Sequence, residues 1–113
     1  MKKSLLLLLF VIGFSISASA QANLEKRAEA SAQKSFEMVD AITKLSDSEK
    51  EIYLVARKKQ AYKHLQLARE LRDTDPDQFR IQSRGNVAVY AASLTKSFGE
   101  KRAMEIRKAE RKK

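Results

Sequence analysis

The sequence predicts an all-α fold of three long helices and a short C-terminal helix, with no β-sheet. Apolar residues recur at spacings of three and four along most of the chain, which is the period of an amphipathic helix. The 113 residues include only one proline and three glycines, whereas a β-sandwich or barrel needs turn residues every ~8–12 positions. This length allows one small domain, and the lack of cysteine excludes disulfides, thiolate metal sites and a lipid-modified cysteine.

Residues 1–20 are expected to be a secretory signal peptide. Two lysines near the start precede an apolar run over 5–16, and small residues follow at 18–20. A permanent membrane anchor is the alternative, but a spanning helix needs ~20 apolar residues. The pattern therefore predicts cleavage after Ala20 and a single helical domain, 21–113, that is periplasmic or secreted.

The first two helices are predicted over about 22–45 and 47–72. The apolar stripe of the first comprises Leu24, Ala28, Ala32, Phe36, Val39, Ile42 and Leu45. Ser46 can cap the second helix, and Glu49 can reach back to the Ser46 amide to complete a capping box. The second helix is apolar on two sides, so we expect it to pack against more than one neighbour.

The third helix is predicted over about 76–96 and the short fourth helix over about 100–111. Pro76 suits the first helical position behind Asp75 as the cap. Gly85 is the weak point of the third helix and permits a bend. The expected inner stripe of this helix is Phe79, Val87, Tyr90 and Leu94.

Positive charge is concentrated in the C-terminal third of the chain. Residues 76–113 carry ten basic and four acidic side chains. The basic run of the last helix, about 100–113, is Lys101, Arg102, Arg107, Lys108, Arg111, Lys112 and Lys113. It could bind anionic lipid headgroups or envelope polysaccharide, or it could be a solvated helix terminus. Nucleic acid is not expected, because the protein is predicted to be exported and no aromatic residue interleaves the basic ones.

At one point of the second helix, there are more apolar side chains than a small core can bury. The four residues Ile52, Tyr53, Leu54 and Val55 are contiguous, so they point to all sides of their helix. A homodimer interface or a client-binding groove would cover those that the core does not.

Catalytic and metal-binding chemistry finds little support in the sequence. His64 is the only imidazole, and its neighbours one helical turn away are neither bases, nucleophiles nor metal ligands. Asp73, Asp75 and Asp77 lack the glycine and the distal glutamate of a calcium loop, and turn formation explains them. We therefore expect no enzyme activity and no cofactor.

The segment 45–49, Leu-Ser-Asp-Ser-Glu, resembles the Leu-Thr-x-x-Gln motif of the Spy/CpxP-like periplasmic proteins. Ser46 stands for the threonine and Glu49 for the glutamine, which keeps the capping chemistry. A second copy near the C-terminus is degenerate, since Leu94-Thr95 is not followed by the glutamine. The resemblance implies a bent helical hairpin that dimerises into a cradle, with an ATP-independent chaperone or envelope-stress role.

Two functional hypotheses follow. In the first, a dimeric, chaperone-like or stress-response protein holds unfolded or envelope-associated proteins through its basic and apolar surface. In the second, an envelope interaction protein docks on anionic lipid or polysaccharide through its basic C-terminal helix. The expected contact residues are Ile52, Tyr53, Leu54, Val55, Lys101, Arg102, Arg107, Lys108, Arg111 and Lys112.

Overall fold

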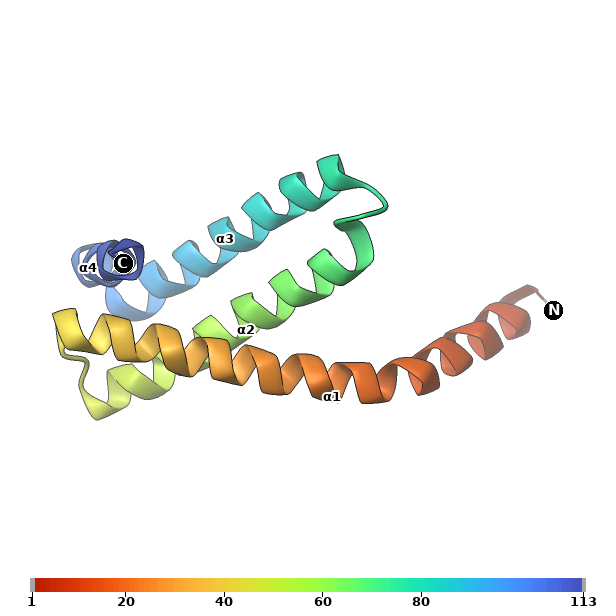
Figure 1. The fold of residues 1–113 in the computed structure, drawn as a ribbon, viewed down its shortest axis with the longest axis horizontal. Coiled ribbons are helices and arrows are strands. Elements are labelled where there is room, and N and C mark those ends of the chain that lie inside the picture. The colour runs from red at the N-terminus through yellow and green to blue at the C-terminus, as the bar shows by residue number, and fades with distance from the viewer. Residues whose placement is uncertain (1, 113) are drawn as a thin grey trace.

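A computed structural model describes the backbone of residues 2–112 and the side chains of residues 20–112. It contains four helices and, within those residues, no strand (Figure 1): α1 (Lys2–Thr43), α2 (Asp47–Leu71), α3 (Pro76–Phe98) and α4 (Glu100–Arg111). The predicted fold class, with three long helices and a short fourth, is confirmed.

The helices form an open layer that is closed at one end. α1 and α3 each pack on α2, and no Cα atom of α1 lies within 8 Å of a described Cα atom of α3. α4 lies across the end where α1 finishes and contacts both α1 and α3; Figure 1 views it end on. We call this the closed end, and the opposite end, where the α2–α3 turn lies, the open end.

The ends of α1 differ from the prediction. The helix finishes at Thr43, two residues early, because Lys44 adopts a left-handed φ of 53° and the Leu45 amide donates to Asp40 Oδ1 at 2.9 Å. It begins at Lys2 rather than near residue 22, since no helix-breaking residue separates the apolar run from the rest. Side chains 1–19, which include most of the expected signal peptide, lie outside the described part of the chain.

The starts of α2 and α3 are as predicted. The Glu49 amide donates to Ser46 Oγ at 3.2 Å and the Ser46 amide donates to Glu49 Oε1 at 3.0 Å, which completes the capping box. Asp75 Oδ1 accepts from the Gln78 amide at 3.2 Å, with a proline at the first helical position. α3 passes through Gly85 without a break.

The main hydrophobic core lies at the closed end, where all four helices meet. It consists of Phe36, Val39, Tyr53, Tyr90, Leu94, Ala103, Ile106 and Ala109. The predicted inner position is wrong for two residues: the exposed fraction is 50 % for Ile42 and 40 % for Val87. α4 contacts only the C-terminal part of α3, so Val87 stays uncovered.

Over residues 20–112, no helix is long and apolar enough to cross a membrane.

Candidate functional site

The four contiguous apolar residues of α2 divide between core and surface. Tyr53 is completely buried, so its predicted role as a contact residue is wrong: its ring packs in the core, 6.5 Å from the ring of Phe36. Leu54 is partly buried against the same core. Ile52 and Val55 are exposed, Val55 by 71 %. Of the four contiguous residues, these two therefore offer the most apolar surface to a partner.

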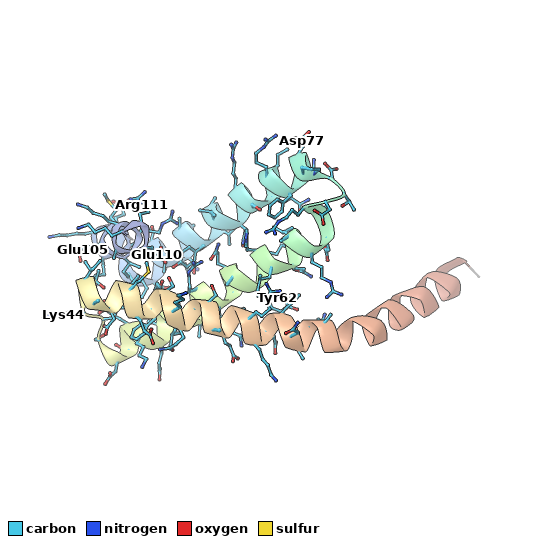
Figure 2. All side chains as sticks on the ribbon, viewed as in Figure 1. Lys44, Tyr62, Asp77, Glu105, Glu110 and Arg111 are labelled. Carbon is cyan, nitrogen blue, oxygen red and sulfur yellow. The ribbon has the colours of Figure 1, made fainter. Side chains whose placement is uncertain are left out.

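A chain of hydrogen bonds joins α4 to the other three helices at the closed end. Tyr53 and Tyr90 donate their hydroxyl hydrogens to the same oxygen of Glu110, Oε2, at 2.7 and 2.5 Å. Because the Tyr53 hydrogen is used there, Ser35 donates to the Tyr53 oxygen at 2.6 Å, and Arg57 Nε donates to Ser35 at 3.1 Å. We call these five residues the carboxylate cluster; Figure 2 labels Glu110 on α4.

Two guanidinium groups compensate the charge of Glu110. Arg57 Nε and Arg107 Nε each lie 3.8 Å from a Glu110 oxygen, and both groups lie over the Tyr90 ring, 5.7 and 5.8 Å from its centroid. Burial, with the negative charge of Glu110 adding to it, raises the pKa of Tyr53 to about 12 and raises the pKa of Tyr90 too. The tyrosines therefore remain protonated donors, and the cluster fixes α4 in place.

Arg102 also attaches α4 to the rest of the protein. Its guanidinium donates to Glu49 Oε2 at 3.0 Å, to the Thr43 carbonyl at 3.1 Å and to Glu105 at 2.9 Å. The Arg102 hydrogen bonds and the Ser46 amide lower the pKa of Glu49 to about 2. Arg102 and the half-buried Arg107 thus form ion pairs with carboxylates of the protein itself, whereas the sequence prediction placed both among the contacts for a partner.

The other predicted contacts of α4 lie on its surface. These exposed cations are Lys101, Lys108, Arg111 and Lys112. Met104, 71 % exposed, lies on the same helix. Lys113 lies outside the described residues.

A second basic surface occupies the open end. A groove of about 950 Å³ runs between α1 and α3 with α2 as its floor. Its apolar lining is Ala61, Leu65, Phe79 and Val87, and its cationic lining is Arg27, Arg57, Arg80 and Arg84. No acidic side chain lines it within the described residues. We call this the arginine groove.

Polar groups in the arginine groove lack partners within the protein. Gln60 Oε1 and Ser83 Oγ are buried and form no hydrogen bond to the part of the chain that is described. Over residues 20–112, Arg27 and Arg84 form no ion pair, whereas Arg80 pairs with Asp77 at 2.7 Å. The groove can therefore offer the cations of Arg27 and Arg84 to a ligand.

Sequence reasoning missed the arginine groove because its residues come from three helices. Arg27, Arg57 and Arg84 lie far apart in the chain, and only Arg84 belongs to the strongly basic C-terminal third. His64 is half-buried in this groove, with its ring 5.8 Å from that of Phe79. No cluster of three potential metal-ligating side chains occurs among the residues that the structure describes.

Protein-family models, curated protein sequences and solved structures were compared with this chain, and none matches it. The fold and the two surfaces define a small all-α protein with one end closed by ion pairs to α4 and one open end that carries the arginine groove.

Proposed function

We propose that the chain is a small non-enzymatic binding protein of the periplasm, with a chaperone-like or envelope-stress role. It holds unfolded or envelope-associated proteins through a basic surface with apolar side chains. The observation that carries the proposal is the arginine groove, where Arg27 and Arg84, which form no ion pair within the described residues, lie beside an apolar floor with no acidic residue in the described lining.

The two parts of the groove support reversible binding in different ways. The apolar floor contributes roughly 25 cal/mol for each Å² that a client removes from water. The guanidinium groups speed association with anionic segments, and their contribution falls with salt because the Debye length is only about 10 Å at 0.1 M.

Aggregation of an unfolding model protein tests this function. The protein lacking residues 1–20 is expected to delay aggregation at low ionic strength, with less protection as salt is added. An equal amount of a helical protein of similar charge without a groove serves as the control. Absence of protection at every salt concentration contradicts the proposal.

Docking on an anionic envelope surface is the second candidate. It is favoured by the exposed cations of α4, Lys101, Lys108, Arg111 and Lys112, because no carboxylate of the described residues pairs with them. Co-sedimentation with vesicles containing phosphatidylglycerol tests it. Binding that is lost when these four residues are changed to glutamine supports this role, and equal binding by the variant excludes it.

Export and self-association complete the proposal. The expected mature protein begins at Gln21, which intact-mass measurement of the exported protein tests; a membrane-bound form that retains residues 1–20 contradicts it. The exposed Ile52 and Val55 would lie in a homodimer interface. Sedimentation as a monomer at high protein concentration contradicts the dimer.

A further inference from the structure

We infer that the arginine groove is selective for acidic polypeptide segments, with ligand carboxylates on Arg27 and Arg84. This inference rests on the proposed function, because it names the kind of client segment that the groove accepts.

The closed end shows how this protein receives a carboxylate between the same helices. There, α4 inserts Glu110 between α1, α2 and α3, with Arg57 at 3.8 Å and two tyrosine hydroxyls as donors. Arg57 also lines the arginine groove, so the two sites adjoin each other. Thus α4, with its Glu110, occupies the site at the closed end. The adjoining arginine groove is also lined by guanidinium groups.

The charge of the groove favours an anionic ligand. Within the described residues, Arg27 and Arg84 form no ion pair, and no acidic side chain contributes to the lining. At the closed end, by contrast, Glu110 lies near Arg57 and Arg107. A guanidinium group bonds a carboxylate through charge-assisted hydrogen bonds, which are stronger than neutral ones.

The separation of the two cations favours a polypeptide over an acyl chain. Arg27 lies on α1 and Arg84 on α3, and no described Cα atoms of these two helices lie within 8 Å of each other. An acidic peptide supplies carboxylates at several positions along its length, whereas a fatty-acid anion has only one.

Binding of two labelled peptides tests the inference by fluorescence anisotropy at low salt. One peptide alternates leucine and glutamate, and its isostere has glutamine in place of every glutamate. We expect the wild-type protein to bind the glutamate peptide about tenfold or more tightly than the isostere, as one retained charge-assisted bond would give.

Matched variants locate the selectivity. The double variant Arg27→Gln/Arg84→Gln is expected to lose the preference, and Lys101→Gln/Lys112→Gln, which removes the same charge from α4, is expected to keep it. Circular dichroism confirms that both variants remain helical. Equal loss in the two variants, or full preference in the groove variant, overturns the inference.

Two further outcomes distinguish this inference from the proposed function on which it rests. Protection of clients without any preference for the glutamate peptide leaves the proposed function in place and overturns the inference. A preference for the glutamate peptide without protection from aggregation supports the selectivity of the groove and contradicts the proposed function. Displacement of the glutamate peptide by laurate at equal molar concentration also overturns the inference, because it assigns the groove to carboxylate-bearing amphiphiles.

Discussion

The closed and open ends of this protein are built on the same three helices, yet they treat their arginines differently. At the closed end, Arg102 binds Glu49, and both Arg57 and Arg107 face Glu110. At the open end, Arg27 and Arg84 form no ion pair with a carboxylate of the described residues. The number of cations on a surface therefore does not identify a binding site; what matters is whether the protein's own carboxylates already neutralise them.

The largest expected effect comes from the apolar contact of α4 at the closed end. Ile106 is completely buried, so Ile106→Ala should lower the free energy of unfolding by about 2–5 kcal/mol in urea titrations. Met104→Ala, on the exposed face of the same helix, is the control and should change it by less than about 0.5 kcal/mol. Equal effects of the two substitutions would show that α4 is not docked as described.

The carboxylate cluster should give the closed end an alkaline limit. Tyr53 ionises near pH 10 in the unfolded chain but only at about 12 in the folded protein, so stability should fall as pH rises from 10 to 12. Tyr53→Phe should cost about 1–3 kcal/mol at neutral pH and reduce this fall. Urea titrations across this pH range test it, and an unchanged alkaline slope in the variant would contradict the cluster.

The Glu49–Arg102 contact should give the closed end an acid limit as well. The folded pKa of about 2 lies below the ordinary value of 4.5, so the contribution is present above pH 4.5 and is lost as pH falls toward 2. Partial exposure screens it to roughly 1 kcal/mol. Glu49→Gln should lack this part of the acid dependence, with Glu37→Gln on the exposed surface as the control.

The smallest expected effect on stability belongs to the open end. The Arg27 and Arg84 side chains contribute no ion pair within the described residues, so Arg27→Gln/Arg84→Gln should change the free energy of unfolding by less than about 0.5 kcal/mol. Thermal and urea unfolding measure it. A loss comparable to that of Ile106→Ala would make these arginines structural and remove the contrast between the two ends.

Sequence reasoning predicted the features that local chemistry decides. Helix starts at Ser46 and Asp75 were predictable because a cap and its partner lie within three residues of each other. The burial of Tyr53 was not predictable in this way. Its hydroxyl group needs a hydrogen-bond acceptor inside the protein, and that acceptor, Glu110, lies 57 positions away in the sequence. The arginine groove was hidden for the same reason, since its residues meet only after three helices have packed.

Amide chemical shifts measured during titration with the glutamate peptide test the central claim most directly. The account predicts that the largest changes lie along the arginine groove, around Arg27, Gln60 and Arg84, and that salt reduces them. Changes confined to the exposed side of α4, or to the surface around Ile52 and Val55, would contradict the assignment of the open end as the binding site.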